Sequence, residues 1–207
     1  MTPPSPPHPP LPPLSPLPPL DFHAFTLHPF LAASPAAPSA LDASPAALTL
    51  TGQVLRRGAE LQISWRLAGA LEGVCLPAPA PVPQRRDGLW QTTCLEFFLA
   101  SPGADAYWEV NLSPAGHWNV YCFSGYRQGM APETALQALP CRVTRTPGVL
   151  QLDLTCNLTA LLPGGGPLEL AITAVLEQAG GALSYWALAH PGSAPDFHRR
   201  DGFQLRL

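Results

Sequence analysis

Residues 48–67 read LTLTGQVLRRGAELQISWRL, and this stretch decides the fold. In residues 61–67 the odd positions are apolar and the even positions are polar, which is the alternation of a strand with one buried face. A second β-prone run, residues 48–55, comes before it. The connection between the two contains Gly58 and has the length of a hairpin loop. The stretch therefore predicts two neighbouring antiparallel strands.

Similar patterns continue to the end of the chain and predict a protein made of strands. Further strands are expected at residues 93–100, 106–112, 117–123, 141–146, 149–156, 168–177, 183–189 and 203–207. Gly148 marks another hairpin turn, and residues 157–163 suit a short helical turn. The 28 prolines argue against long helices. Many short strands without alternating helices predict an all-β antiparallel β-sandwich or jelly roll.

The proline distribution divides the 207-residue chain into a tail and one domain. Eleven prolines and no charged side chain fall in residues 1–20, which predicts an extended, disordered tail without a packed core. Such a tail either binds a proline-recognising partner or is a low-complexity extension. Residues 21–207 form the single expected domain, with loops rich in proline and alanine at residues 32–46 and 77–88.

Charge and cysteine usage narrow the classes of partner and compartment. The net charge is −3 and all eleven basic residues are arginine, without the basic stripe of a nucleic-acid-binding protein. The five cysteines lack CxxC spacing, which favours buried thiols in a reducing compartment over a disulfide framework. Because no apolar run reaches 18 residues and no Lys or Arg precedes Arg56, we expect no membrane span or export signal and a cytoplasmic location.

Glu96 interrupts an apolar strand, residues 93–100. An unpaired buried carboxylate is costly, so Glu96 needs a partner. The partner is either an arginine such as Arg127, in a structural ion pair, or a ligand that donates hydrogen bonds to the carboxylate.

The next two predicted strands carry a polar and aromatic face. Alternation places Glu109 and Asn111 on one side of the first strand, and Asn119 and Tyr121 are expected opposite them on the second. This face either contacts solvent or lines a ligand site. Tyr, Asn and Glu are unusual choices for an idle sheet surface, which favours the ligand site.

Two tryptophans are candidate stacking platforms for the apolar face of a sugar ring. Trp90 follows the proline-rich loop, and Trp186 lies on a late strand. Each of them also suits the core, because tryptophan buries a large apolar surface.

Several segments resemble the bacterial DOMON-like proteins, which are similar to family-9 carbohydrate-binding modules. They are residues 88–98 (GLWQTTCLEFF), 107–114 (YWEVNLSP), 116–118 (GHW), 123–127 (FSGYR), 185–191 (YWALAHP) and 195–198 (PDFH). The resemblance covers residues 22–207 and implies a β-sandwich that binds a ligand. In the sugar modules two tryptophans clamp a mono- or disaccharide, and a carboxylate six residues after the first tryptophan binds hydroxyls. Trp90, Glu96 and Trp186 match that pattern here, and Asn111 and Arg127 are further carry-overs.

Three functions remain open on these residues. The first is a non-catalytic module for a small sugar or related polar metabolite, without nucleic-acid or membrane partners. Its candidate ligand-binding residues are Trp90, Glu96, Glu109, Asn111, Tyr121, Arg127, Trp186, His190 and His198.

The second is electron transfer by a b-type haem, because some DOMON relatives hold haem between Met and His, and Met130 with His190 or His198 would supply these ligands. The third is an enzyme that uses His117, His190, His198, Asp196 or Glu109, although the chain carries none of the common catalytic motifs. We expect no metal and no catalytic residue, and haem is the alternative to an absence of cofactors. No acidic cluster for calcium is evident in the sequence.

Overall fold

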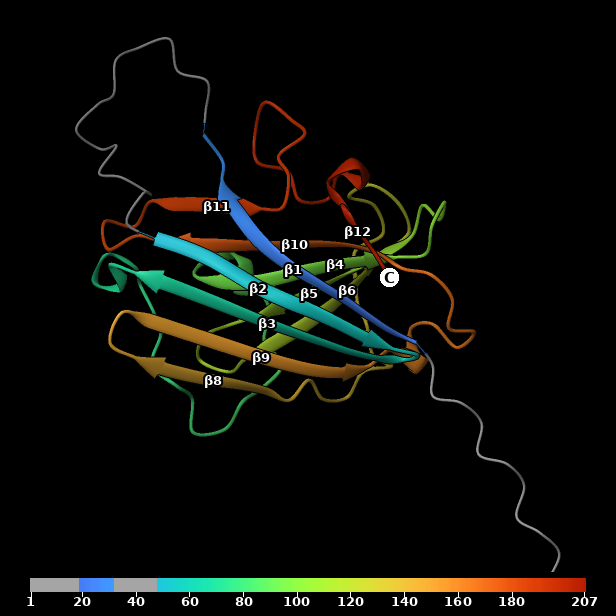
Figure 1. Cartoon of the computed structure of the whole chain (residues 1–207), viewed down its shortest axis with the longest axis horizontal. Coiled ribbons are helices and arrows are strands. Elements are labelled where there is room, and N and C mark those ends of the chain that lie inside the picture. Colours follow the sequence, from blue (N-terminus) through green and yellow to red (C-terminus); the bar gives the residue numbers. More distant parts are fainter. Residues whose placement is uncertain (1–18, 32–47) are drawn as a thin grey trace, which may run out of the picture.

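The computed structural model describes residues 19–31 and 48–207 (Figure 1). The predicted tail, apart from its last two residues, and the predicted loop at residues 32–46 lie outside the described residues. Leu20, the last residue assigned to the tail, already begins the first strand.

The described chain is all-β, as predicted, and its twelve strands form one curled antiparallel sheet. The strands are β1 (Leu20–Pro29), β2 (Leu48–Arg57), β3 (Glu60–Gly69), β4 (Cys94–Ala100), β5 (Tyr107–Leu112), β6 (Trp118–Phe123), β7 (Ala131–Pro132), β8 (Cys141–Thr146), β9 (Val149–Asn157), β10 (Glu169–Glu177), β11 (Leu183–Ala187) and β12 (Leu205–Arg206). Short 3₁₀ turns cover Leu71–Gly73, Leu89–Gln91, Leu158–Ala160 and Arg200–Gly202.

The strand order defines two layers that share a core. The order is β7-β6-β5-β4-β10-β11-β1-β2-β3-β9-β8, and β12 pairs with β10 (Figure 1). The curled sheet folds into two halves that face each other. We call the half β1-β2-β3-β9-β8 the first sheet and the half β7-β6-β5-β4-β10-β11 the second sheet. Strand β1 joins them, because it pairs with β2 along eight residues and with β11 at His28 and Pro29. Trp65 of the first sheet and Phe97 of the second meet in the core with ring centroids 6.3 Å apart.

Both predicted hairpins are present. Gly58 turns β2 into β3 with a φ of 59°, and Gly148 turns β8 into β9 with a φ of 69°. Glycine adopts these left-handed conformations without the Cβ penalty of other residues. Each predicted strand has a counterpart in the structure; the strand at residues 141–146 matches β8 at both ends, and the others are shifted at one or both ends.

The sequence analysis missed β1 and the two-residue β7. In β1 the apolar positions change phase: Leu20 and Phe22 point outward and are about half exposed, whereas Phe25 and Leu27 point into the core. This change of phase hides the period of two that identifies a strand.

The second sheet is buried on both of its faces, unlike the first. In β4 all seven residues are buried, whereas β3 alternates between buried and exposed positions. The face of the second sheet that points away from the core carries its own aromatic cluster, which includes Phe98, Tyr107 and Phe123. Loops cover this outer face, and Trp90 and Phe197 from these loops pack against the cluster. The outer face of the second sheet is therefore where the chain builds a site.

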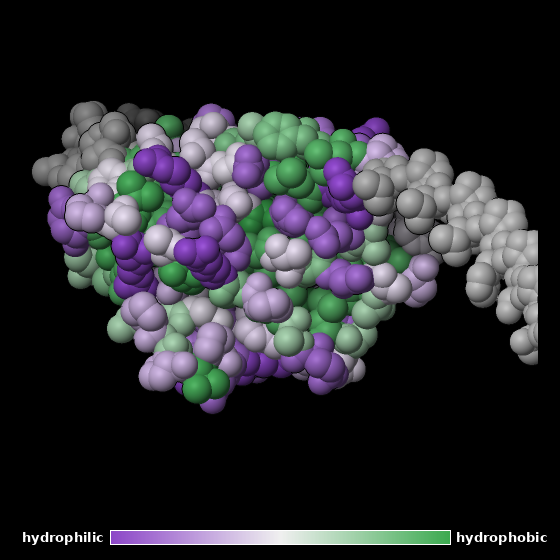
Figure 2. Space-filling model, turned by 60° about the horizontal axis from the view of Figure 1, so that its bottom comes forward, coloured by the Kyte–Doolittle hydropathy of each residue, from purple (hydrophilic) through white to green (hydrophobic). Residues whose placement is uncertain are grey.

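The surface has mixed polarity, with hydrophilic and apolar residues interspersed on the face that Figure 2 shows. Within the described residues, no helix is long and apolar enough to span a membrane.

Candidate functional site

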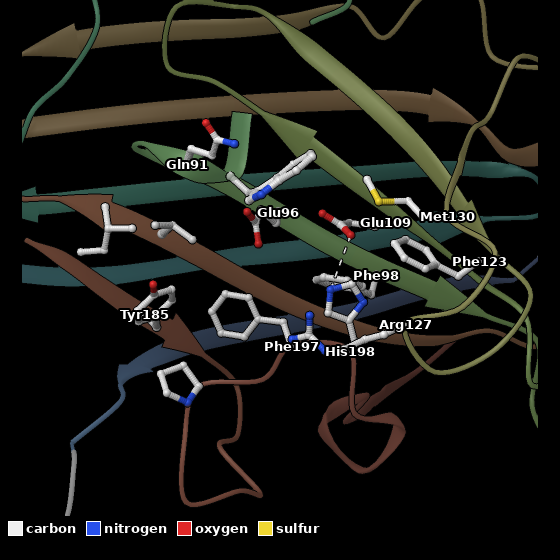
Figure 3. A pocket seen from close by; sticks show the side chains of 14 residues that line it. Gln91, Glu96, Phe98, Glu109, Phe123, Arg127, Met130, Tyr185, Phe197 and His198 are labelled. Carbon is white, nitrogen blue, oxygen red and sulfur yellow. Dashed lines mark ion pairs between the residues drawn. The ribbon is translucent and has the colours of Figure 1, made fainter. Parts of the chain in front are cut away.

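A cavity of about 530 Å³ lies on the outer face of the second sheet (Figure 3). This volume falls in the range of roughly 300–1,000 Å³ that is typical of small-molecule sites. Strands β4, β5 and β6 supply Glu96, Glu109 and Phe123, and loops and β11 supply most of the wall. The full lining is Trp90, Gln91, Glu96, Phe98, Glu109, Phe123, Arg127, Met130, Val175, Leu183, Tyr185, Pro195, Phe197 and His198.

Glu96 is the most deeply placed polar group of the cavity. Its neighbours Leu95 and Phe97 point into the core, so strand alternation turns the Glu96 side chain to the outer face. The residue is 2% exposed, and its Oε2 accepts a hydrogen bond from Thr173 Oγ1 at 3.2 Å. Its Oε1 is buried and has no hydrogen-bond partner.

Arg127 is not the partner of Glu96, so the first of the two alternatives, a structural ion pair with Arg127, is wrong. The Arg127 guanidinium instead contacts Asp196 Oδ1 at 2.9 Å. An unpartnered buried oxygen in a native protein calls for an explanation, such as a ligand or a catalytic role.

Burial raises the pKa of Glu96 from its ordinary value of 4.5 to about 8, and the negative charge of Glu109 adds to the rise. The hydrogen bond from Thr173 acts in the opposite direction. At neutral pH Glu96 is therefore mostly a neutral carboxylic acid, which can donate one hydrogen bond as well as accept others.

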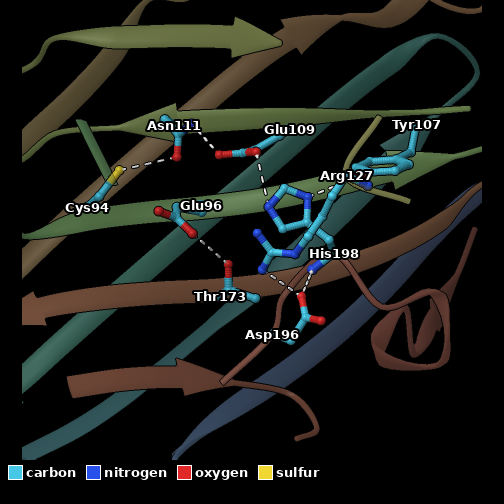
Figure 4. A network of polar contacts seen from close by, with 9 residues as sticks. All are labelled: Cys94, Glu96, Tyr107, Glu109, Asn111, Arg127, Thr173, Asp196 and His198. Atoms are coloured by element: carbon cyan, nitrogen blue, oxygen red, sulfur yellow. Dashed lines mark hydrogen bonds and ion pairs between the residues drawn. The ribbon is translucent and has the colours of Figure 1, made fainter. Parts of the chain in front are cut away.

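Glu109 is held by a chain of hydrogen bonds that begins at β4 (Figure 4). Cys94 Sγ donates to Asn111 Oδ1 at 3.6 Å, and Asn111 Nδ2 donates to Glu109 Oε1 at 2.7 Å. Burial raises the pKa of Glu109, and the Asn111 hydrogen bond and the Arg127 charge offset part of that effect. Asn111 is fully buried and does not line the cavity, so its role is to orient Glu109.

His198 closes the network from the other side. Its Nδ1 lies 2.8 Å from the Tyr107 hydroxyl, and its Nε2 lies 3.9 Å from Glu109 Oε2. Burial lowers the pKa of His198 to about 4, and the nearby charge of Arg127 adds to that shift. The imidazole is therefore neutral at pH 7, and its approach to Glu109 is a polar contact rather than an ion pair. The Tyr107 hydroxyl also accepts from the Arg127 backbone N–H at 3.2 Å.

Asp196 links two loops beside the cavity, the loop that follows β6 and the loop that follows β11. Its carboxylate accepts hydrogen bonds from the Tyr126 hydroxyl, from the Arg127 guanidinium and from the His198 backbone N–H. Partial burial acts to raise the pKa of Asp196, but the hydrogen bonds from Tyr126 and Arg127 outweigh it and lower that pKa. We call Tyr126, Arg127 and Asp196 the loop latch.

Aromatic rings form the apolar walls of the cavity. Trp90 is partly exposed and packs edge-on against Tyr121, with ring centroids 5.4 Å apart. On another side, Tyr185 and Phe197 pack edge-on against each other at 6.1 Å. Tyr121 itself is 2% exposed and does not line the cavity. Its hydroxyl donates to Asp87 and accepts from Asn119. These hydrogen bonds fix the ring against which Trp90 packs.

Trp186 is not the second aromatic platform, and this correction follows from strand parity. The side chain is 2% exposed and belongs to the main core. Its neighbour Tyr185 faces the cavity instead. His190 also lies outside the cavity lining, where its Nε2 contacts the His28 carbonyl oxygen at 2.8 Å.

Five of the nine predicted ligand-binding residues line the cavity, and the structure adds rings that the sequence analysis did not select for ligand binding. Trp90, Glu96, Glu109, Arg127 and His198 line it, whereas Asn111 and Tyr121 support lining residues. The additional rings are Phe98, Phe123, Tyr185 and Phe197. Three of these rings lie on strands beside or between selected residues, and alternation from Glu96 would have found Phe98.

The groups named for haem or catalysis are only partly brought together. Met130 and His198 line the same cavity, whereas His190 lies outside its lining. The Nδ1 atom of His198 lies 2.8 Å from the Tyr107 hydroxyl, and its Nε2 atom lies 3.9 Å from Glu109 Oε2. His117 lies outside the cavity lining and accepts a hydrogen bond from the Gln84 backbone N–H. Across residues 19–31 and 48–207, no group of three His, Cys, Asp or Glu side chains is arranged to hold a metal ion.

Comparisons with known proteins bear on the fold. No family model matches the chain, and neither does any curated protein. Two structures of a family 9 carbohydrate-binding module from Caldicellulosiruptor kristjanssonii, with cellotriose and with glucose, match with TM-scores of 0.42 and 0.40 at 8% identity. These matches cover 70% of this chain and 68% and 69% of those chains.

A crystal structure of a candidate carbohydrate-binding protein from Bacteroides uniformis gives a TM-score of 0.63 at 14% identity. This match covers 88% of this chain and 84% of that chain. The chain therefore shares the fold of the Bacteroides protein.

Proposed function

We propose that this protein is a non-catalytic binding domain for a small sugar or a related polar metabolite, which it holds in the cavity on the second sheet. The observation that carries the proposal is Glu96 Oε1, a buried oxygen without a protein partner on the floor of that cavity. A ligand hydroxyl at this position would satisfy it, and burying an unsatisfied polar atom otherwise costs about 1–3 kcal/mol.

The walls and floor suit the two kinds of surface that a sugar presents. The rings of Trp90, Tyr185 and Phe197 offer apolar faces against which the C–H face of a pyranose can pack. Glu96 and Glu109 project together from the floor and can pair with ring hydroxyls (Figure 3). Such a site is mostly apolar, with a few directed polar groups that fix orientation.

The fold gives supporting analogy. The Bacteroides protein that shares the fold is itself a candidate carbohydrate binder. Binding without chemistry fits the polar network, in which Asn111, Tyr107 and Thr173 already engage the titratable groups. We accordingly expect no hydrolysis of chromogenic glycosides by the purified protein.

Tryptophan fluorescence during titration with glucose, xylose and cellobiose tests the proposal. We expect at least one of these sugars to quench the emission, because Trp90 borders the cavity. Trp90→Ala should weaken binding at least tenfold, since it removes a stacking surface. Trp108→Phe is the matched control, because Trp108 packs against the main core and donates to Glu133 Oε2.

Two results would overturn the proposal. One is quenching that survives Trp90→Ala with unchanged affinity, which would place the sugar elsewhere. The other is a lack of binding, by fluorescence and by calorimetry, for all three sugars at millimolar concentration.

A further inference from the structure

We infer that the ligand of this cavity carries a protonated amine, which binds between the carboxylates of Glu96 and Glu109 while its apolar body packs against the aromatic walls. The inference rests on the proposed function in one respect, because it takes the same cavity as the binding site. The ligand class is then an amino sugar or another compact amine rather than a neutral or anionic metabolite.

The two carboxylates are placed so that one cationic group can contact both. Glu96 is paired with Asn111 across β4 and β5, and Glu109 lies two residues from Asn111 on the same strand. The carboxylates are therefore diagonal neighbours on one face of an antiparallel pair, with Cα atoms roughly 7–8 Å apart. Both side chains point into the cavity, as Figure 3 shows. An ammonium group has three donors and no acceptor, which matches a pair of acceptors.

Each carboxylate keeps an oxygen that the protein leaves available. Glu96 Oε1 has no partner, while Oε2 is bonded to Thr173. Glu109 Oε1 accepts from Asn111, and its Oε2 has only the long 3.9 Å contact with His198. The protein thus gives one oxygen of each residue a hydrogen bond and leaves the other without one.

The positive groups near the floor compensate these carboxylates only in part, through the charge of Arg127 on Glu109. Arg127 is the one arginine among the cavity-lining residues of the described chain, and the Asp196 carboxylate binds its guanidinium at 2.9 Å. His198 is neutral at pH 7, because burial lowers its pKa to about 4. Cys94 is fully buried and its thiol stays protonated, because burial raises its pKa. An anionic ligand would meet two carboxyl groups here and no free cation.

The walls favour a cation over a neutral group as well. Five aromatic rings line the cavity, from Trp90, Phe98, Phe123, Tyr185 and Phe197. The face of an aromatic ring attracts ammonium groups through the ring quadrupole. A metal ion is a poorer candidate, because no set of three His, Cys, Asp or Glu ligands is assembled anywhere in the described residues.

Proton release distinguishes an amine from a neutral ligand. In the free protein the buried Glu96 carries a proton at pH 7, because burial and Glu109 raise its pKa to about 8. A bound ammonium group stabilises the ionised form of both carboxylates, so the proton leaves to solvent when the amine binds. A neutral sugar supplies no charge and should release almost none. Tyr107, which faces Glu109 through His198, stays protonated because burial raises its pKa.

Calorimetry with two matched ligand pairs tests the inference. The pairs are glucosamine with glucose, and cyclohexylamine with cyclohexanol, each titrated at pH 7 in two buffers of different ionisation enthalpy. We expect the amine of at least one pair to bind tenfold or more tightly than its neutral partner, with release of up to about one proton. A preference for glucosamine over glucose would indicate an amino sugar as the ligand class, and a preference for cyclohexylamine over cyclohexanol would indicate a simple amine.

Two variants separate a charge effect from a loss of structure. Glu96→Gln keeps the shape of the protonated side chain and should reduce the preference for amine over neutral ligand at least fivefold. Glu72→Gln, which removes an exposed carboxylate outside the cavity, should leave that preference unchanged. Should Glu96→Gln fail to fold, proton release by the unaltered protein still decides the question.

The outcomes separate this inference from the proposed function. If glucose binds as tightly as glucosamine without proton release, the amine inference fails and the proposed sugar site stands. If cyclohexylamine binds with proton release and no sugar binds, the amine site stands and the sugar assignment fails. If no member of either pair binds, the amine inference fails.

Discussion

Glu96 lies in the middle of a strand that is buried along its whole length, with Leu95 and Phe97 in the core on either side. Its side chain avoids that core only because successive residues of a strand point to opposite faces. The same alternation makes it a cavity group rather than a defect of packing. The proposed binding site therefore centres on one buried carboxyl group, of which Oε2 has a hydrogen-bond partner in the protein and Oε1 has none.

Stability should depend on pH through Glu96. Between its ordinary pKa of 4.5 and its folded pKa of about 8, the unfolded chain has released a proton that the folded protein keeps. Rising pH therefore favours unfolding in this window, by at most about 1.4 kcal/mol per pH unit. Glu96→Gln should remove this loss, so urea unfolding should show the variant gaining on the unaltered protein from pH 5 to pH 8. A difference that stays constant with pH would contradict the raised pKa.

The sequence predicted Glu96, Glu109 and Asn111 as site residues because a polar side chain in an apolar strand needs a hydrogen-bond partner in the protein or in a ligand. It selected Trp186 rather than Tyr185 for the ligand site, and this choice was wrong; the two residues are adjacent, aromatic and equally compatible with a core. The choice depends on which face of β11 meets the first sheet, and that is a property of tertiary packing. Burial of the larger ring in the core left the smaller one to the cavity.

At the scale of elements, β1, β2 and β3 are packed unusually closely at Gly52. A Cβ atom on this residue would lie 2.0 Å from the Ser64 carbonyl oxygen and 2.3 Å from the Phe25 ring. Phe25 and Trp65 are the cross-strand partners of Gly52, so an aromatic residue flanks the glycine on each neighbouring strand.

Gly52→Ala should therefore destabilise the protein by about 2–3 kcal/mol, because the backbone of β3 has to shift to admit a methyl group. Chemical denaturation measures this change. Gly164→Ala is the matched control, because a Cβ at Gly164 meets nothing within 4 Å, and we expect a change within about 0.5 kcal/mol. Equal effects of the two substitutions would argue against the close approach.

The loop latch should matter more for binding than for stability. The Arg127 side chain is 51% exposed, and ion pairs of this kind contribute about 0–1 kcal/mol. Asp196→Asn should thus change the melting temperature little, while it accelerates amide hydrogen exchange in residues 196–198 and weakens ligand binding several-fold. Asp201→Asn breaks the surface pair with Arg199 and serves as control. Equal exchange rates in the two variants would show that the latch does not order this loop.

The loops also show where sequence reasoning ends. The strand patterns predicted most of the sheet because burial on one face imposes a period of two. Nothing local in residues 191–199 indicates that this segment crosses to Tyr126 and Arg127, since the contacts join residues about 70 positions apart. Similarly, the change of phase in β1 concealed the strand that joins the two sheets.

For the molecule as a whole, the five cysteine thiols differ in how deeply the sandwich buries them. Cys94 and Cys156 are buried, and burial raises the pKa of both, to about 12 for Cys156. Because the thiolate is the reactive form, we expect iodoacetamide at pH 8 to leave these two unmodified in the native protein. Cys75 and Cys122 are partly exposed and should react first.

Mass spectrometry of the alkylated protein checks this order of reaction. In urea all five cysteines should be modified at similar rates, because unfolding removes the difference in burial. Rapid native modification of Cys94 would contradict both its burial and its hydrogen bond to Asn111.

Strand β1 has a consequence for how the chain is made. It leaves the ribosome before the other described strands, yet it joins the two sheets by pairing with β11, which is synthesised more than 150 residues later. During translation the edge of β1 that later pairs with β11 has no partner strand until the second sheet has been synthesised. Because contacts between such distant residues slow folding, closure of the sandwich, and with it the cavity, should be a late event that follows the synthesis of β10 and β11.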